Sequence, residues 1–165
     1  AEIVGVCGGF QMLGRTILDP HGIESTAGRA DGLGLLPVTT TLAREKTLVR
    51  VTATHAASGR AVAGYEIHHG QTDAGGLERV LRHEDGTWSG AAACGHRVWG
   101  THLHGIFDAD EFRRWFVDRL RVRRGLEPVG RVVARYDIEP ALDRLAGVVR
   151  EALPVDKIYR MMGLR

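Results

Sequence analysis

The sequence predicts an α/β domain, and three parts of the chain support this prediction together. A short apolar run at residues 3 to 7 leads through a glycine-rich turn into a helical pattern, which is typical of a buried parallel strand followed by a helix. The middle of the chain carries the alternating and β-branched patterns of strands. Beyond Gly105 the periodicity is helical again. This order favours an α/β domain over an all-β one.

The elements are expected in the following order. A strand covers residues 3 to 7 and a helix residues 8 to 17, where Met12, Leu13 and Ile17 have helical spacing. Residues 18 to 34 are rich in Gly, Asp and Pro and predict a long loop. Strands are then expected at residues 35–41, 47–54, 61–67, 78–83, 86–93 and 98–103.

Helices are expected in the last third of the chain. The first covers residues 108 to 124, begins with a cap at Asp108 or Asp110, and is ended by Gly125 and Pro128. Two more cover residues 139–153 and 155–164. The arginines of the first helix alternate with apolar residues, which fits a solvated helix face better than a site for an anionic partner.

The composition is that of one ordinary globular domain. The 165 residues are 44% apolar and 25% charged, with a net charge of +2. No apolar run approaches the roughly 20 residues of a membrane span, and no signal peptide is visible. Two cysteines, Cys7 and Cys94, do not make a disulfide framework, and we interpret Cys94 as a buried filler. We therefore expect a cytoplasmic protein with neither nucleic acid nor membrane as a partner.

The first residues suggest that more chain precedes them. A parallel strand at residues 3 to 7 needs neighbours on both sides, yet nothing precedes it in this sequence. We expect the chain to be the C-terminal part of a longer protein. Residues 1 to 165 would then form one domain that is incomplete at its N-terminus.

A G-x-C-x-G pattern at residues 5 to 9 is the strongest chemical signal. It matches a nucleophile elbow with Cys7 in place of serine. Glycine at positions 5 and 9 would avoid clashes in the sharp turn, the following helix would stabilise the thiolate, and the Gly8 N–H would face the oxyanion of a tetrahedral intermediate. A small buried cysteine or a phosphate-binding turn are the alternatives, and the spacing of a P-loop is absent.

A thiol nucleophile needs a base, and Thr101 to Gly105 contains two histidines. His102 and His104 would point to the same side of a strand. His104 is preferred because it lies at the strand end, where the sites of open α/β sheets gather. A metal site on the two histidines is the alternative, but no third ligand has suggestive spacing.

Two further polar stretches are less specific. Residues 64 to 72 could end a strand, turn at Gly70 and carry incidental histidines in an exposed loop. Asp19, Pro20 and Glu24 are typical of turn residues.

Five ordered blocks together resemble the cobyric acid synthase family, whose C-terminal part is a class I glutamine amidotransferase domain. They are residues 4–14, residues 19–20 with Glu24, residues 32–37 with 46–47, residues 64–72 and residues 100–107. The resemblance implies a three-layer open mixed sheet of the flavodoxin-like type, with its first strands outside this chain. It also implies hydrolysis of glutamine, which supplies ammonia for the ATP-dependent amidation of four carboxylates of adenosylcobyrinic acid a,c-diamide in cobalamin biosynthesis.

The resemblance also implies residue roles. Cys7 would form a glutamyl thioester, His104 would transfer the protons, and Gly8 would donate to the oxyanion. Substrate-binding roles would fall to four residues, of which the first would contact glutamine and the others would line its pocket: Gln11, Tyr65, Glu66 and His68.

No cofactor or metal is expected in this chain. The resemblance places ATP and Mg in an N-terminal synthetase domain, through which the corrinoid substrate would also be bound. That domain and a loop that donates a second oxyanion N–H are outside the chain. We therefore expect the isolated chain to be poorly active, since losing one oxyanion donor typically costs about 100- to 1000-fold in rate.

One departure from the class I pattern concerns the base. Class I enzymes commonly carry Glu two residues after the catalytic histidine, and that position is Ile106 here. The subfamily shares this departure. The group that orients His104 is therefore open, with Glu66 as a candidate.

Three other functions fit part of the pattern. The amidotransferase subunit of lipid II isoglutaminyl synthase shares a similar elbow, and cobyrinic acid a,c-diamide synthase is a second enzyme alternative. From a different class, the chain could be an inactive binding or interaction domain that retains the fold. The presence of both Cys7 and His104 argues against that last alternative.

Overall fold

The computed structural model describes residues 1–164. The chain divides into two compact units, Ala1–Val132 and a second one that begins at Val133. The prediction that residues 1–165 form one domain is not tested by this division and stays a prediction. The strands of the first unit are β1 (Ile3–Val6), β2 (Thr16–Leu18), β3 (Arg29–Asp31), β4 (Thr39–His55), β5 (Arg60–Asp73), β6 (Leu81–His83), β7 (Trp88–Ser89), β8 (Ala91–Ala93) and β9 (Val98–Thr101).

The sheet that carries the candidate site is formed by β1, β9 and β8, in that order. Strands β1 and β9 are parallel, with Val6 opposite Thr101, whereas β8 and β9 are antiparallel. The sheet is therefore mixed. Because β1 and β9 run in the same direction, the segments that follow them emerge at the same edge.

Helices pack on both faces of this sheet. Helix α1 (Gly8–Leu13) contributes Phe10 and Leu13 to a core cluster that includes Val98 of β9. The next residue along β9, Trp99, belongs instead to the cluster around Phe112 of helix α2 (Asp110–Arg123). Adjacent residues of a strand point to opposite faces, so the sheet is the middle of three layers. The predicted α/β class with a mixed sheet is confirmed.

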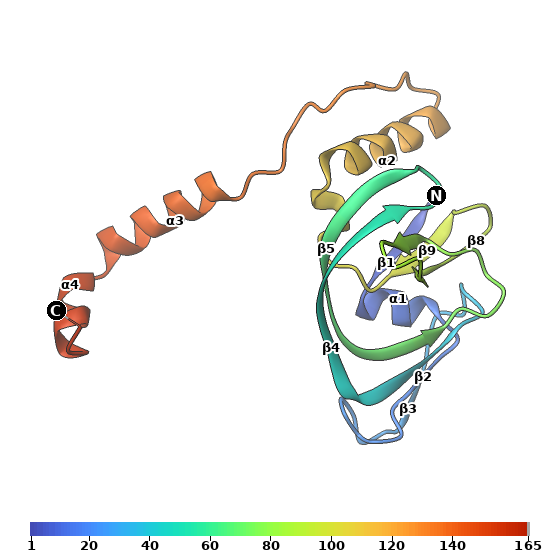
Figure 1. The fold of residues 1–165 in the computed structure, drawn as a ribbon, viewed down its shortest axis with the longest axis horizontal. Helices are drawn as coiled ribbons and strands as arrows, with labels where there is room; N and C mark the ends of the chain where they lie inside the picture. Colours follow the sequence, from blue (N-terminus) through green and yellow to red (C-terminus); the bar gives the residue numbers. More distant parts are fainter. Residues whose placement is uncertain (165) are drawn as a thin grey trace. The chain divides into compact units, whose positions relative to one another are not determined.

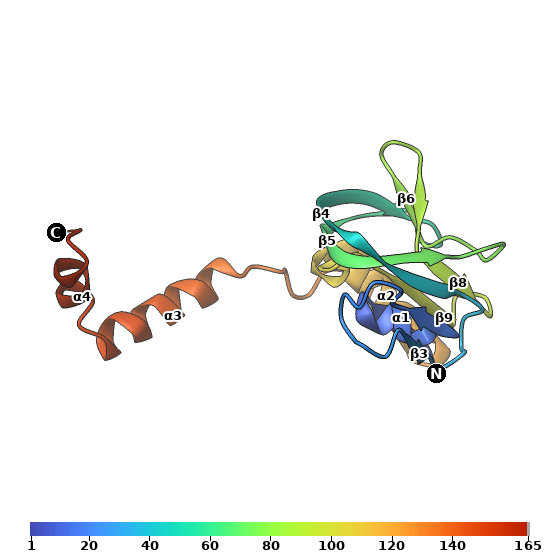
Figure 2. The ribbon, with the colours of Figure 1, turned by 90° about the horizontal axis from the view of Figure 1, so that it is seen from below.

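A second sheet has the strand order β3-β2-β4-β6-β7, and β5 pairs with β4. Strands β4 and β5 are long and antiparallel, with an irregularity between Leu42 and Thr47. Figure 1 shows them as two curved strands that run side by side, and Figure 2 shows the same pair from below. The curvature brings the middle of β5 to the candidate site, as the next section describes.

Several predicted boundaries were wrong. The first helix ends at Leu13 rather than at residue 17, and β3 lies inside the predicted loop of residues 18 to 34. The two strands expected at 35–41 and 47–54 form the single strand β4, whereas the one expected at 86–93 is divided into β7 and β8. Gly70 lies inside β5, opposite Leu42, and is no turn. The physical reason is that pairing with a distant partner overrides the local pattern.

The helix after the candidate base begins differently from the prediction. A short 3-10 helix, Ile106–Asp108, precedes α2, and the N-cap of α2 is Ala109 rather than an aspartate. The first turn still carries Asp110 and Glu111, which are favourable at a helix N-terminus. Arginines of α2 form ion pairs within the unit, among them Arg114 with Asp118 and Arg123 with Glu2. These arginines are therefore paired with carboxylates of the same unit, and the solvated helix face stays a prediction.

The second unit contains the predicted helices at slightly shorter lengths, α3 (Glu139–Ala152) and α4 (Val155–Met161). Neither helix has a buried residue. Apolar side chains such as Leu142 and Leu145 stay exposed. In the part of the chain that the structure describes, no helix combines the length and apolarity needed to cross a bilayer.

Candidate active site

Cys7 lies at a strained turn between β1 and α1. Its backbone has φ 52° and ψ −114°, a region that residues with a side chain seldom adopt. A Cβ added to Gly5 would stand 2.7 Å from the backbone of Gly9 and from the Phe10 nitrogen, so only glycine fits at position 5. A Cβ added to Gly9 would meet nothing within 4 Å. The elbow prediction is thus supported, but the predicted need for glycine at position 9 is wrong.

The turn is anchored to its neighbours on both sides. The Cys7 N–H donates to the carbonyl oxygen of Thr101 at 2.8 Å, and the Gln11 N–H donates to the carbonyl oxygen of Cys7 at 3.1 Å. The Cys7 thiol lies 3.8 Å from the carbonyl oxygen of Ile67 on β5. The sulfur is therefore held between the β1–β9 edge and the middle of β5.

His104 reaches the same part of β5. Its N–H donates to the carbonyl oxygen of Tyr65 at 2.8 Å, and the Tyr65 N–H donates back at 3.2 Å. The two rings are stacked, with centroids 5.0 Å apart and planes 7° from parallel. Among residues 1–164, the buried Nε2 atom of His104 has no hydrogen-bond partner.

Cys7 and His104 lie at the same edge of the sheet, as the sequence predicts, while direct proton exchange between them stays a prediction. Cys7 directly follows β1, and His104 follows the parallel neighbour β9 by three residues. Both contact the short stretch of β5 from Tyr65 to Ile67. The carboxyl edge of adjacent parallel strands is where α/β proteins place reactive groups.

Glu66 and His68 form a buried pair instead of acting on His104. The His68 Nε2 atom lies 3.3 Å from Glu66 Oε2, and both side chains are about nine-tenths buried. The Nδ1–H of His68 donates to the Gly70 carbonyl oxygen at 2.7 Å. Glu66 Oε1 has no partner among the described residues. Within residues 1–164, the Glu66 side chain therefore has a hydrogen-bond partner only in His68, and the suggested orienting role for His104 is without support.

His102 belongs to a polar layer that the sequence did not reveal. Strand β9 ends at Thr101, so the argument from strand alternation fails, and the His102 ring stacks on His68 with centroids 3.9 Å apart. His102 Nε2 lies 3.2 Å from the Thr72 hydroxyl, which lies 2.7 Å from the Thr40 hydroxyl. Residues 30 or more apart in sequence meet here, so no local pattern could signal the layer.

The charges of this layer follow from burial. Burial lowers the pKa of His102 to about 4, helped by the charge of His68, so His102 is neutral near pH 7. Burial also opposes ionisation of Glu66, but the hydrogen bond and charge of His68 outweigh it and lower the pKa of that carboxyl. A carboxylate and a neutral imidazole thus lie on either side of His68.

Gln11 and Gly8 lie on α1, next to the nucleophile. The Gln11 side chain is buried, and a Cβ added to Gly70 would stand 2.4 Å from its Nε2 atom. Gly8 is the first residue of α1 and is exposed. Both predicted residues are thus within one helical turn of Cys7, while their roles toward glutamine remain predictions.

Comparison with known proteins bears on this arrangement. A family model described as the CobB/CobQ-like glutamine amidotransferase domain matches residues 1–112. The match includes the elbow, the polar stretch of β5 and His104.

The chain belongs to this family.

Relatives of this amidotransferase domain carry consistent names. The cobyric acid synthase of Nitratidesulfovibrio vulgaris is 51% identical and is matched by 98% of this chain, which covers 36% of that protein. The adenosylcobalamin biosynthesis bifunctional protein CobDQ of Leptospira interrogans is 48% identical over 99% of the chain and 19% of the relative. The cobyric acid synthase of Bradyrhizobium diazoefficiens is 44% identical over 97% of this chain and 32% of the relative. The chain therefore spans about a third or less of the length of these relatives.

A solved structure is also similar, although distantly. The crystal structure of a glutamine amidotransferase from Thermotoga maritima matches with a TM-score of 0.38 and 12% identity. The match covers 76% of this chain and 50% of that one.

Asp19 has a clearer structural role in the amidotransferase domain than its sequence position indicated. Its carboxylate accepts hydrogen bonds from the N–H groups of Ile23, Glu24 and Ser25 at 2.7 to 3.0 Å. These bonds, above all the one from Ile23, lower the pKa of Asp19. Asp19 therefore organises the loop after β2, in agreement with the prediction of a turn residue.

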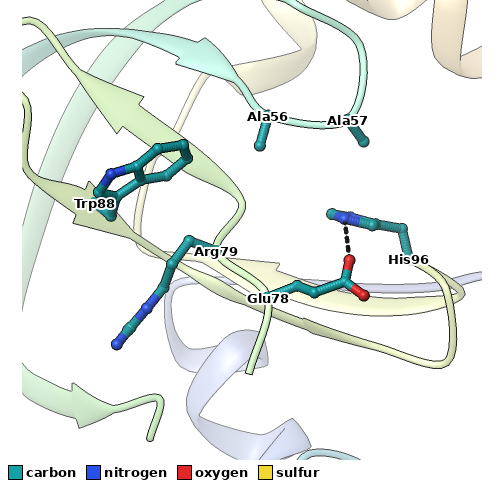
Figure 3. A pocket seen from close by; sticks show the side chains of 6 residues that line it. All are labelled: Ala56, Ala57, Glu78, Arg79, Trp88 and His96. Carbon is teal, nitrogen blue, oxygen red and sulfur yellow. Dashed lines mark ion pairs between the residues drawn. The ribbon is translucent and has the colours of Figure 1, made fainter. Parts of the chain in front are cut away.

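One apolar cavity of the domain lies away from Cys7. It measures about 400 Å³ and is lined by Ala56, Ala57, Glu78, Arg79, Trp88 and His96. Figure 3 shows Glu78 and His96 pointing toward each other, and the Oε2 atom of Glu78 lies 2.8 Å from the Nε2 atom of His96. His96 precedes β9, whereas His104 follows it. The cavity is thus at the amino end of β9 and outside the candidate site.

Two other expectations concern cysteine and metal. Cys94 is free and exposed, so the interpretation as a buried filler was wrong; it lies in a tight turn with φ 54°. Within residues 1–164, no group of three or more His, Cys, Asp and Glu side chains is arranged to hold a metal ion.

Proposed function

We propose that this domain hydrolyses glutamine through Cys7 and His104 and delivers the ammonia to a cobyric acid synthase reaction. The observation that carries the proposal is the position of the two residues. A strained elbow presents Cys7 at the end of β1, beside the parallel strand that leads to His104, and both contact residues 65 to 67 of β5. The family membership and the names of the relatives support the reaction class.

In this mechanism the Cys7 sulfur attacks the side-chain amide carbon of glutamine after its proton passes to His104. The oxyanion that forms would accept a hydrogen bond from the Gly8 N–H. His104 returns the proton to the nitrogen as the C–N bond breaks, which releases ammonia and leaves a glutamyl thioester. Water, deprotonated by His104, then attacks the thioester and releases glutamate and the free thiol.

The ammonia would be used elsewhere in the protein. We assign ATP, Mg and the corrinoid substrate to a synthetase domain, because the relatives are about three times as long as this chain. The acceptors would be four carboxylates of adenosylcobyrinic acid a,c-diamide. A cytoplasmic location fits the use of ATP and the two free thiols.

The test compares two nitrogen sources in the full-length protein. Cys7→Ser and His104→Ala should each lower glutamine-dependent amidation by at least about 1000-fold, while amidation with added ammonium salts persists because the synthetase site is intact. Cys94→Ser is the matched control, since that thiol is exposed and distant in sequence from the elbow. Glutamine-dependent activity that survives in Cys7→Ser would refute the proposal.

A further inference from the structure

Neither of the two positions considered for a carboxylate that orients the candidate base supplies one. The position two residues after His104 is Ile106, whose side chain is 1% exposed and packs in the core cluster of Phe112. Glu66, the other candidate, is paired with His68. Neither position therefore supplies an acceptor for the His104 imidazole.

Tyr65 contacts His104 in two independent ways. A pair of backbone hydrogen bonds, at 2.8 and 3.2 Å, joins the two residues as an isolated antiparallel bridge. In addition, the phenol ring lies flat on the imidazole, with centroids 5.0 Å apart and planes 7° from parallel. The backbone contact places the Cα atom of His104, and the ring contact restricts rotation of its side chain.

We propose that Tyr65 is the positioning residue of His104, in the place that a carboxylate takes in other class I enzymes. This inference rests on the proposed function. A base transfers protons efficiently only when its ring is held in a productive orientation. The flat face of the phenol supplies that orientation without a hydrogen bond, and an aromatic face also attracts the imidazolium that forms when His104 takes the thiol proton.

The arrangement distinguishes Tyr65 from a residue that only lines the glutamine pocket. A pocket wall acts on binding, so its loss raises KM. A residue that holds the base acts on the chemical step, so its loss lowers kcat. The phenol oxygen is not part of the ring contact with His104, and Tyr65→Phe should therefore retain the function.

The experiment measures glutamine hydrolysis by the full-length protein with Tyr65→Leu, Tyr65→Thr and Tyr65→Phe. Loss of the ring should lower kcat by about 10- to 100-fold, the cost of a misplaced catalytic group, with little change in KM. Tyr65→Phe should behave like the unmodified protein. Trp88→Leu is the matched control, because Trp88 is a strand residue with similar exposure, 49% against 47% for Tyr65, and it lies at the separate cavity.

The outcomes separate this inference from the proposed function. A raised KM with unchanged kcat in Tyr65→Leu and Tyr65→Thr, or a loss in Tyr65→Phe equal to theirs, overturns the positioning role. Unchanged kinetics in all three Tyr65 variants also overturns the positioning role. If Cys7→Ser is inactive in the same assay, the proposed function still stands. Hydrolysis that persists in Cys7→Ser overturns both proposals. Two replacements of different shape guard against one that fails to fold, which thermal unfolding would reveal.

Discussion

Individual residues in the elbow have unequal tolerance for a side chain, although they look alike in sequence. Gly5 faces the backbone of Gly9 so closely that a methyl group would stand 2.7 Å from it. Gly9 itself faces open space. The turn thus depends on one glycine of the pattern for its geometry, and Cys7 is placed by that close approach.

We expect Gly5→Ala to destabilise the domain by about 1–3 kcal/mol, because overpacking forces the backbone to shift, and to reduce the reactivity of Cys7. Gly9→Ala is the matched control in the same turn. It should be neutral or stabilise by about 0.5–1 kcal/mol, since alanine favours a helix over glycine. Urea unfolding and the alkylation rate of Cys7 measure the two effects. Equal losses in both variants would contradict this account.

Two buried histidines make stability depend on pH. Burial is the main cause that lowers the pKa of His55 and of His102 from 6.5 to about 4. The unfolded chain therefore binds these protons at a higher pH than the folded one. The contribution of the two neutral rings to the free energy of unfolding is fully present above pH 6.5. It is lost as the pH falls from 6.5 toward 4, because the unfolded chain then binds protons that the folded chain does not. The lowered pKa of Glu66 adds a loss only below its ordinary value of 4.5.

We therefore expect His55→Phe to flatten the pH dependence between pH 6.5 and 4.5. Each such histidine contributes up to about 1.4 kcal/mol per pH unit to the slope, and phenylalanine fits the ring cluster of Trp99, Phe112 and Trp115 around His55. Urea unfolding at several pH values measures the slope. His21→Gln, at an exposed position, should leave it unchanged. An unaltered slope in His55→Phe would show that His55 does not carry the effect.

At the scale of elements, the packing of α2 against the sheet contributes strongly to the stability of the domain. Phe112 is fully buried and contacts Trp99 of β9 and Phe107 of the preceding turn. We expect Phe112→Ala to cost about 3–5 kcal/mol, the usual price of removing a buried phenylalanine. Val122→Ala on the same helix, at 57% exposure, should stay within about 0.5 kcal/mol. Thermal and urea unfolding would compare the two.

The elements nearest the candidate site were also those that could be predicted best. The strand β1, the turn at Cys7 and the strand before His104 each carry a local signal, either an apolar run or a glycine that a close approach requires. The continuity of β4 and the full length of β5 could not be predicted from the strand patterns within them. In β4 the residues 44 to 46 are exposed and the strand is irregular there. Its alternation is interrupted, and the pairing that makes it one strand is with β5.

The same reasoning explains which site residues escaped prediction. The stacking of His68 on His102 and the bond from Thr72 to Thr40 join three separate segments. Only the tertiary structure brings them together. The sequence could predict that Cys7 and His104 share an edge, because parallel strands place their carboxyl ends together. It could not predict that Tyr65 lies flat on His104.

At the scale of the whole molecule, the two units differ in how many of their own apolar residues are buried. Both hydrophobic core clusters consist entirely of residues from the first unit. In the second unit, α3 and α4 have 14 and 7 residues and bury none of them. Helices of that length are marginal in water without tertiary contacts. The first unit therefore contains two apolar cores around which it can fold cooperatively, whereas the helices α3 and α4 have no buried residue.

We expect a chain that ends at Val132 to keep a cooperative urea transition, because both hydrophobic core clusters lie within residues 1–132. A peptide of residues 133 to 165 should show little helix by circular dichroism. Loss of the cooperative transition in the shortened chain, or a stably helical peptide, would show that α3 and α4 contribute stability that the two clusters do not account for.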